Sequence, residues 1–310
     1  MIEPITQPVS TIIIPTRPQP DTIVAIFLLQ TFGKEIYADV DTAKFEVDPK
    51  ATDAPDKLLL DVGGGELDHH GTDLCASELV AKKLILTNKP ELRNLIAYAR
   101  RDDTEGKGTV SKDPLDRAFG LSGLIASLNK QNPIDPQYVI NTTLPLLRAH
   151  YYTANEHHVE LPKHVKGLQQ TDMFKSETIQ KPFRNMKVAF VTSDHIGLAG
   201  YLRSVAGGGY SLIAQRRTSG HVNVLTKQNP KIDLSRVIAM LRLYEANLHK
   251  VEIEDERSLR DTGTHKLVPN WYYDPATNSL LNGGVTPDSI ESTKIDWPEL
   301  QAIILHSLQN

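Results

Sequence analysis

Short apolar runs alternate with longer helical patterns through the first 135 residues of the chain. The runs TIIIP (11–15), EIYADV (35–40) and DKLLLDV (56–62) predict strands, and the last is apolar enough to be buried on both faces. Between the first two, DTIVAIFLLQTFG (21–33) predicts a helix that begins at an Asp21 N-cap and stops at its final glycine. Such alternation is typical of an α/β domain with a mostly parallel sheet.

Three more helical segments are expected next, in the runs ASELVAKKLIL, PELRNLIAYARR and DPLDRAFGLSGLIASLNK. The sequence pattern then changes, because a long helical pattern is followed by a polar stretch. We interpret residues 136–185 as a helical linker between an N-terminal domain, 1–135, and a smaller α/β C-terminal domain, 186–310. A chain of 310 residues is long enough for two domains.

The C-terminal region starts a second α/β pattern, with a strand at MKVAFVTS (186–193) and a helix at HIGLAGYLRSVA. The strand runs GGGYSLIAQRR and GHVNVLT are joined by RTSG, which predicts an antiparallel pair. A helix follows in DLSRVIAMLRLYEANLHK, and the Gly, Pro and Asn content of NWYYDPATNSLLNGG favours a hairpin or loop.

Composition narrows the class of protein. The chain is 40% hydrophobic and 23% charged, and its formal charge of −4 does not suggest a protein that coats polyanions. The longest apolar runs, such as TIVAIFLL, fall far short of the roughly 20 residues that span a bilayer, so we expect no membrane segment. The N-terminus shows no secretory signal, and the single cysteine, Cys75, fits a reducing compartment; we therefore expect a cytoplasmic protein.

The stretch DVGGGELDHHGTD (61–73) carries the densest chemistry in the sequence. Asp61 directly follows a predicted strand, at the sheet edge where parallel α/β domains bind ligands. Asp68, His69 and His70 follow after a short link. Two other places offer carboxylates to the same edge, namely Asp21 and the pair Asp102–Asp103. Aspartates with imidazole and no thiolate suit Mn²⁺, Mg²⁺ or Zn²⁺, which lower the pKa of a bound water and orient a phosphate.

Each of these features also has a structural interpretation. Asp61 could cap a turn, the triple glycine at 63–65 could be only a tight turn, and acidic residues that end a helix are usually solvated. Convergence of all of them on one sheet edge is what a structural interpretation explains poorly. The sequence therefore favours a metal site.

The Asp68-His69-His70 triplet resembles the signature of the DHH phosphoesterase superfamily, which includes RecJ-like nucleases and family II pyrophosphatases. The close spacing of DVGG and DHH looks most like the melanocyte-proliferating-gene family, whose members are linked to 3′–5′ RNA exonuclease activity. NWYYDPATNSLLNGG is similar to the end of that family. The resemblance is strong over 11–108 and weaker, but collinear, over 186–285. It implies a DHH-type N-terminal domain with a parallel sheet.

The resemblance also implies roles for individual residues. Asp21, Asp61, His69 and Asp103, or its neighbour Asp102, would be metal ligands. His70 would face the phosphate as a catalytic group, and Asp68 would orient a histidine. Gln19 and Pro15 stand where the superfamily has further ligands, with Arg17 nearby, which leads to the hypothesis of one tightly bound metal and a second site that is weak or absent. Mn²⁺ is the expected metal and Mg²⁺ the alternative.

In the superfamily the second domain clamps the substrate with a Gly-rich, basic surface. Here the corresponding residues would be Gly207, Gly208, Gly209, Arg216, Arg217 and His221. Tyr210 replaces the usual histidine of that element, and a Gly-rich turn with solvated arginines is the alternative interpretation. Asp194 and His195 could face the cleft or cap a helix, and Trp271, Tyr272 and Tyr273 could stack on a base or belong to the core.

The expected activity is metal-dependent hydrolysis of a phosphodiester in a nucleotide or short single-stranded nucleic acid, in the manner of an exonuclease. Two alternatives stay open: a pyrophosphatase or small-nucleotide phosphatase, and a nucleotide-binding regulator that has lost turnover. A homodimer is a further possibility. The sequence leaves the substrate length and the cleavage polarity undetermined.

Overall fold

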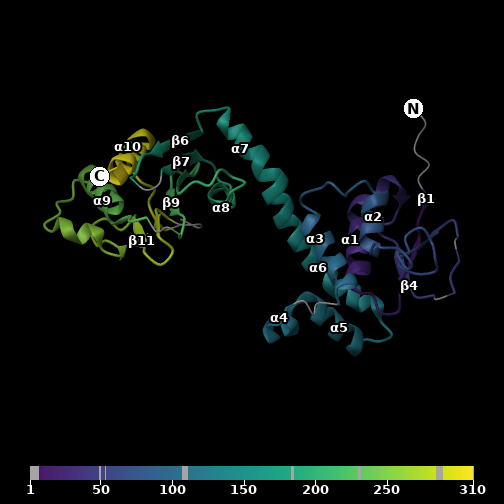
Figure 1. Cartoon of the computed structure of the whole chain (residues 1–310). Coiled ribbons are helices and arrows are strands. Elements are labelled where there is room, and N and C mark those ends of the chain that lie inside the picture. Colours follow the sequence, from purple (N-terminus) through teal and green to yellow (C-terminus); the bar gives the residue numbers. More distant parts are fainter. Residues whose placement is uncertain are drawn as a thin grey trace. The chain divides into compact units, whose positions relative to one another are not determined.

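The computed structural model describes residues 7–48, 50–52, 54–106, 111–182, 185–229, 232–283 and 289–309 (Figure 1). The chain forms two compact units, Met1–His158 and Val159–Asn310, which we call unit 1 and unit 2. Their boundary falls inside the segment interpreted as a helical linker. No helix in the described part of the chain is long and apolar enough to cross a membrane.

Unit 1 contains the expected parallel sheet. β2 (Thr11–Ile13) lies between β4 (Lys44–Glu46) and β5 (Lys57–Leu59) and pairs in parallel with both. The run at 35–40 is mostly not a strand. η1 (Gly33–Glu35) is a 3-10 turn, and only β3 (Tyr37–Ala38) pairs, in parallel with β1 (Gln7–Pro8). The chain then turns at Asp39, whose φ of +62° ends the strand.

Helix α1 (Pro20–Phe32) occupies the centre of unit 1, and every residue from Pro20 to Leu29 is buried. The N-cap is Gln19, so the prediction of an Asp21 cap was wrong. Pro20 takes the first helical position, where a fixed φ and a missing N–H are tolerated, and this moves Asp21 into the first turn. α1 contacts α2 (Ala76–Lys83), α3 (Arg93–Thr104) and α6 (Pro136–Asn155), so Asp21 is held rigidly at one end of the core.

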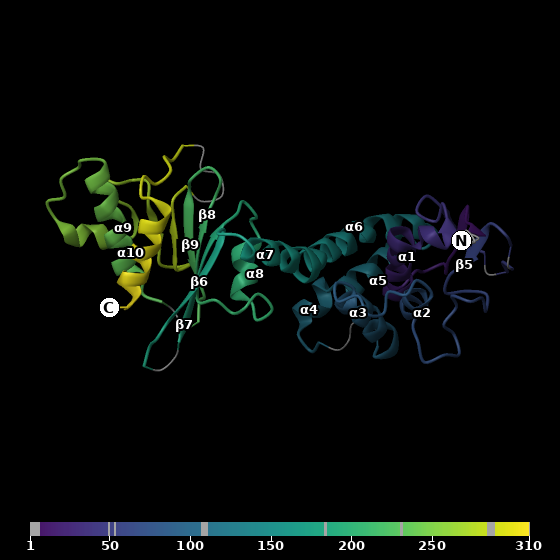
Figure 2. The ribbon, with the colours of Figure 1, turned by 90° about the horizontal axis from the view of Figure 1, so that it is seen from above.

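The run DPLDRAFGLSGLIASLNK forms two helices instead of the one expected. α4 (Pro114–Phe119) is capped by the Asp113 side chain, and α5 (Leu121–Gln131) follows after a break at Gly120. A Cβ at Gly120 would lie only 2.4 Å from the Asp116 carbonyl oxygen, so the tight turn needs a glycine. Figure 2 shows α5 beside α3 and α6.

Unit 2 is built on a seven-stranded mixed sheet in the order β10-β11-β12-β9-β8-β7-β6. β7 (Met186–Thr192) and β8 (Leu212–Arg216) are parallel and are joined by α8 (Leu198–Arg203). The expected antiparallel pairing of β8 with β9 (Val222–Thr226) is confirmed, as is the hairpin of β11 (Tyr272–Asp274) with β12 (Ser279–Leu281). The remaining edge strands are β10 (Gly263–Thr264) and β6 (Phe174–Ile179), which was expected to be linker.

Helices cover both faces of this sheet (Figure 2). Val188 and Phe190 of β7 pack with α9 (Ser235–Leu248) and α10 (Trp297–Gln309), whereas Ala189 and Val191 pack with α7 (Leu161–Gln169) and α8. The two-residue period of a strand explains this alternation. A π-helical turn, Glu156–Glu160, precedes α7, and a 3-10 turn, Glu256–Arg260, follows α9.

Candidate metal centre

The loop after β5 folds back so that both of its ends reach the same place. The Asp61 amide donates to the Leu67 carbonyl at 3.0 Å, and Leu60 bridges to Leu67. Asp61 has a φ of +60°, and Gly63 and Gly64 have φ values of +77° and +68°. A non-glycine residue in this left-handed region is uncommon, and such backbone strain gathers at functional sites. The loop thereby returns the DHH triplet to the sheet edge where Asp61 lies.

One cavity of about 550 Å³ opens at this edge, and we call it the metal cleft. It is lined by most of the residues that the sequence singled out, from four separate segments of unit 1: Asp21, Asp61, Asp68, His69, His70 and Asp103, together with Pro15, Arg17 and Gln19. The expected convergence of carboxylates and imidazoles on one sheet edge is therefore present.

His69 lies at the centre of the carboxylates. Its Nε2 is 3.0 Å from Asp61 Oδ1 and 3.6 Å from Asp21 Oδ2, and its Nδ1 is 3.7 Å from Asp103 Oδ2. Nδ1 is also 3.0 Å from the Leu74 carbonyl oxygen, which can only accept, so Nδ1 donates this hydrogen bond. Nε2 then faces two carboxylates, so a cation bound between these groups would have nitrogen and oxygen ligands within reach.

The surroundings of Asp61 Oδ1 also suit a cation. This oxygen is buried and pairs with His69 Nε2 at 3.0 Å, and its neighbour Oδ2 accepts from Thr22 at 2.6 Å. A buried carboxylate is costly unless a positive charge or hydrogen bonds satisfy it. A histidine that donates one N–H to a backbone carbonyl and turns its other nitrogen towards carboxylates has the usual geometry of a metal ligand.

Two groups of ligand atoms are close enough to hold an ion. Asp21, His69 and Asp103 form one group and Asp61, His69 and His70 the other, with the ligand atoms of each group within 4.8 Å of one another. His69 belongs to both. The donor set is oxygen and imidazole nitrogen without sulfur, which suits Mn²⁺ or Mg²⁺ better than a soft metal.

The carboxylates of the cleft have perturbed pKa values. Burial, and then repulsion from Asp61 and Asp103, raises the pKa of Asp21 from its usual value of 3.8 to about 6. Burial also raises the pKa of Asp61, against the opposing hydrogen bond from Thr22. Negative charge is thus crowded and poorly solvated here without a metal, which is the electrostatic state that a divalent cation relieves.

Asp68 and His70 form a separate pair at the mouth of the cleft. Asp68 Oδ1 lies 2.6 Å from His70 Nδ1, and Asp68 Oδ2 accepts from the Gly64 amide at 2.7 Å. Burial alone would raise the pKa of Asp68, but the hydrogen bonds from His70 and Gly64 hold it below its usual value. The bond to Asp68 raises the pKa of His70, whose side chain is 71% exposed. His70 is therefore an oriented, accessible proton donor.

The structure separates the two acidic residues at the end of α3. Asp103 lines the metal cleft and approaches His69, whereas Asp102 is buried and lines a neighbouring cavity with Gln19 and Asn129. Successive residues of a helix point about 100° apart, so only one of the pair can reach the cluster. Asp103 is the member that the geometry favours as a ligand.

Thr22 is a residue of the site that the sequence did not bring forward. Its fully buried hydroxyl donates to Asp61 Oδ2 at 2.6 Å and accepts from the Gln19 amide at 3.3 Å. It therefore ties the start of α1 to the acidic loop. Its position next to Asp21 was the available signal, but a threonine in a helix start usually means only a cap.

We expect Thr22→Val to weaken metal binding by roughly 10–100-fold, since Asp61 loses the bond that orients it. The same change should lower the free energy of unfolding by about 1–3 kcal/mol, because Asp61 Oδ2 is left unpaired. Calorimetric Mn²⁺ titration and hydrogen exchange of the α1 amides measure the two effects. Thr22→Ser keeps the hydroxyl and should retain most of the metal affinity and of the stability. Equal metal affinity in Thr22→Val and the wild type would contradict the role of Thr22 in orienting Asp61.

The three glycines of unit 2 do not present their N–H groups to a ligand, contrary to the sequence-based expectation. Gly207 donates to Ser204 Oγ, Gly208 to the Val205 carbonyl and Gly209 to the Ser204 carbonyl. Gly208 and Gly209 have φ values of +107° and +71°, and a Cβ on Gly207 would lie 2.0 Å from the Tyr201 carbonyl oxygen. The glycines are required by the tight turn that ends α8.

The basic residues expected beside these glycines lie at the other end of β8. Arg216 ends that strand and Arg217 follows it, whereas Gly209 precedes its start, a separation on the order of 20 Å along an extended chain. Both ring nitrogens of His221 are engaged, with Ser219 Oγ at 3.0 Å and the Ile290 carbonyl at 2.8 Å. The structure therefore does not bring the six expected substrate-binding residues together.

The other candidate site residues of unit 2 mostly make structural contacts. Trp271 is fully buried and donates to Glu245, and Tyr273 is 8% exposed, so of the three aromatic residues Tyr272 alone is accessible. Asp194 accepts two hydrogen bonds from Thr218, at 3.0 and 2.7 Å, and so ties the ends of β7 and β8 together. His195 Nδ1 accepts from the Gly197 amide at 3.2 Å, close to the start of α8.

Comparisons with known proteins do not assign a family. No protein-family model matches the chain, and no curated protein matches it. Among solved structures, an uncharacterized protein from Helicobacter pylori G27 aligns with 98% of this chain and 99% of its own, at 11% identity and a TM-score of 0.25. A functional assignment therefore depends on the residues of the metal cleft.

Proposed function

We propose that the protein is a metal-dependent phosphoesterase that hydrolyses a phosphodiester of a nucleotide or short nucleic acid. The observation that carries the proposal is the arrangement at His69, whose Nε2 lies 3.0 Å from Asp61 Oδ1 and 3.6 Å from Asp21 Oδ2. The resemblance of DVGGGELDHH to the DHH phosphoesterases supports the same conclusion independently of the geometry.

Asp21, Asp61, His69 and Asp103 would hold the metal, with Mn²⁺ favoured over Mg²⁺ because an imidazole is among the ligands. A metal in this position supplies a nucleophilic water at neutral pH and neutralises charge on the phosphate. Leu74 and Thr22 orient the ligands through the hydrogen bonds described above. We expect one ion to bind tightly and a second weakly if at all, because Gln19 and Pro15, with Arg17 nearby, line the cleft where the superfamily has further ligands.

His70 and Arg17 would act on the substrate. His70, held by Asp68 at 2.6 Å, would donate a proton to the leaving oxygen of the phosphodiester. Arg17 is exposed, lines the cleft and would bind a non-bridging phosphate oxygen. His70 would thus assist departure of the alcohol product, and Arg17 would orient the phosphate.

The charge of the cleft favours a phosphodiester over pyrophosphate. Among the described residues that line it, Arg17 is the single permanently charged cation, against the aspartates Asp21, Asp61, Asp68 and Asp103. Pyrophosphate carries more negative charge than a diester and calls for several lysines and arginines. A regulator that has lost turnover is the second candidate, which Gln19 in place of a ligand favours.

A metal-supplemented activity screen tests the proposal. Chelated protein is reloaded with Mn²⁺, Mg²⁺ or Co²⁺ and offered a generic phosphodiester reporter, pyrophosphate, pAp, cyclic dinucleotides and short RNA and DNA, with metal content measured in parallel. We expect Mn²⁺-stimulated cleavage of a diester and about one tightly held ion per chain. Nucleotide binding without turnover under any metal would favour the regulator, and two tightly held Mn²⁺ ions would contradict the single-metal hypothesis.

A further inference from the structure

Three cavities of unit 1 follow one another through shared residues. The metal cleft shares Arg17 and Gln19 with a cavity of about 240 Å³ beside α5, and that cavity shares Ser122 and Gly123 with a third cavity of about 700 Å³. Because each cavity shares lining residues with the next, the three adjoin one another in a row. We call this row the α3–α5 groove, and it leads from the metal cleft to helix α4.

Beyond the metal cleft, the groove carries basic side chains in both of its other cavities. Arg17 lies where it leaves the metal cleft, Lys130 lines its middle, and Arg101 and Arg117 line its far cavity. All four side chains belong to exposed residues, and none of them forms an ion pair with a described carboxylate. The acidic residue of the middle cavity is Asp102, which is buried. The acidic residue of the far cavity is Asp116, which accepts from Ser111 at 2.7 Å. Uncompensated cations spaced along a groove are what a phosphate backbone binds.

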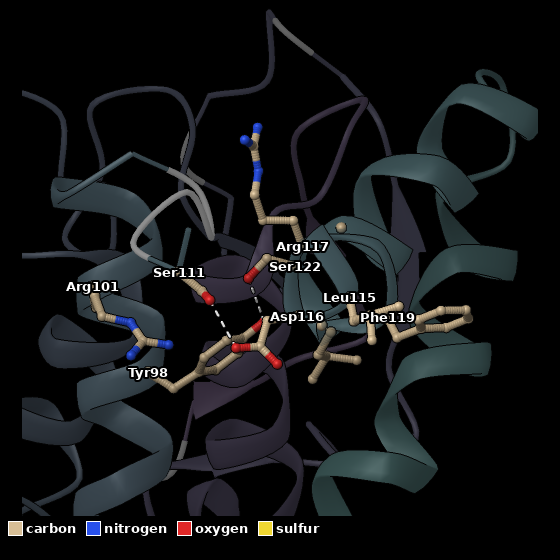
Figure 3. A pocket seen from close by; sticks show the side chains of 11 residues that line it. Tyr98, Arg101, Ser111, Leu115, Asp116, Arg117, Phe119 and Ser122 are labelled. Atoms are coloured by element: carbon tan, nitrogen blue, oxygen red, sulfur yellow. Dashed lines mark hydrogen bonds between the residues drawn. The ribbon is translucent and has the colours of Figure 1, made fainter. Parts of the chain in front are cut away.

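The far cavity also has an apolar wall (Figure 3). Tyr98 and Arg101 lie on one side of it, with the Tyr98 hydroxyl 2.8 Å from Ser122 Oγ, and Leu115 lies on the other. Leu115 is 66% exposed and its neighbour Phe119 is 73% exposed, although both are large apolar side chains. A bare polyphosphate would gain nothing from such a wall, whereas the sugars and bases of a nucleic acid would cover it.

We propose that the α3–α5 groove binds the part of a single-stranded oligonucleotide that lies beyond the phosphate held at the metal cleft. This rests on the proposed phosphodiesterase function and adds the substrate class to it, a chain of several nucleotides in place of a mononucleotide or pyrophosphate. Arg17 and Lys130 contact phosphates near the cleavage point, Arg101 and Arg117 contact phosphates further along, and Leu115 packs against a sugar or base.

The test compares a decanucleotide with a dinucleotide in the metal-loaded full chain. In Arg101→Glu/Arg117→Glu we expect the ratio of kcat/KM for the longer substrate to that for the shorter to fall on the order of tenfold or more. Lys89→Glu/Arg93→Glu makes the same charge change at exposed residues of unit 1 that line none of the three cavities, and should leave the ratio unchanged. An unchanged ratio in Arg101→Glu/Arg117→Glu overturns the proposal.

A binding measurement keeps the groove testable apart from catalysis. The affinity for a hydrolysis-resistant phosphorothioate decanucleotide is measured against salt concentration, and the slope of log K should fall by about 1.4 in the double variant, or about 0.7 per lost phosphate contact. If the wild type hydrolyses no substrate but this slope changes as expected, the proposed activity fails and the groove stands. An unchanged slope with intact hydrolysis rejects the groove alone.

A third comparison distinguishes a nucleotide chain from polyphosphate. Leu115→Ser should weaken decanucleotide binding severalfold and leave the binding of a ten-unit polyphosphate unaltered. Ile134→Ser removes an apolar residue of unit 1 that is 93% exposed and serves as its control. Polyphosphate that binds as tightly as the oligonucleotide, with neither ligand sensitive to Leu115, would overturn the assignment to nucleic acid.

Discussion

Replacement of His69 by alanine is expected to lower Mn²⁺-dependent phosphodiester hydrolysis by at least about 10³-fold, and to remove the stabilisation of the protein by Mn²⁺. His69 is the one side chain shared by both candidate ligand groups, and its Nε2 lies within 3.6 Å of both Asp61 and Asp21. Loss of a metal that stabilises the transition state by several kcal/mol corresponds to a rate change of that size. Steady-state kinetics and the shift of the unfolding midpoint with Mn²⁺ measure the two effects.

His150→Ala provides the matched control, because His150 is an exposed histidine of unit 1 on α6 and lines none of the cavities described above. It should keep wild-type turnover and the wild-type response to Mn²⁺. A folded His69→Ala protein with normal activity would refute the assignment of the metal centre. Loss of turnover with an unchanged response to Mn²⁺ would instead place the metal elsewhere and leave His69 as a catalytic group.

The N-terminal unit was the more predictable part of the chain, because its signals are local and physical. Apolar runs at 11–15 and 56–62 can be buried only in a sheet covered on both faces, and β2 and β5 form there. Polar residues that directly follow such strands must lie at the sheet edge, which is why Asp61 could be placed in a site. The fold-back that brings His69 to Asp61 depends on two positive-φ glycines and the Leu67 bridge, which the sequence suggests but does not specify.

The second unit was less predictable because its motifs do not tell which way a backbone N–H group or a side chain points. A glycine run signals backbone freedom, but it does not tell whether the N–H groups face a ligand or, as at Gly207, the preceding helix. Neighbouring residues of a strand point to opposite faces, so the aromatic run could not reveal that Tyr273 is buried and Tyr272 exposed. Thr22 and the Leu74 carbonyl were missed for a related reason, since their partners are fixed by tertiary structure alone.

Asp21→Asn should stabilise the metal-free protein while it destroys tight metal binding. The pKa of Asp21 is raised from 3.8 to about 6, first by burial and then by repulsion from Asp61 and Asp103. Between these two pH values the unfolded chain has released the proton that the folded chain still holds. The free energy of unfolding of unit 1 in a chelator therefore falls as the pH rises from about 4 to about 6, by roughly 3 kcal/mol in total, and stays low above pH 6.

The neutral asparagine has nothing to ionise, so this loss should disappear in the variant. At pH 7.5 in a chelator, Asp21→Asn is expected to be more stable than the wild type by up to about 3 kcal/mol, and at pH 4 the two should be nearly equal. Hydrogen exchange of the α1 amides (Pro20–Phe32) is the appropriate measurement, because both tryptophans, Trp271 and Trp297, lie in unit 2 and their fluorescence would not report on unit 1.

With Mn²⁺ bound, the wild type should become more stable than Asp21→Asn. A ligand that binds only the folded state stabilises it by an amount that grows with its concentration relative to Kd, so the wild type gains stability while Asp21→Asn gains little. Asp73→Asn removes an exposed carboxylate of unit 1 and should match the wild type in both conditions. Asp21 would be a structural residue, and the cluster around His69 no metal centre, if Asp21→Asn proved less stable in the chelator and bound Mn²⁺ as tightly as the wild type.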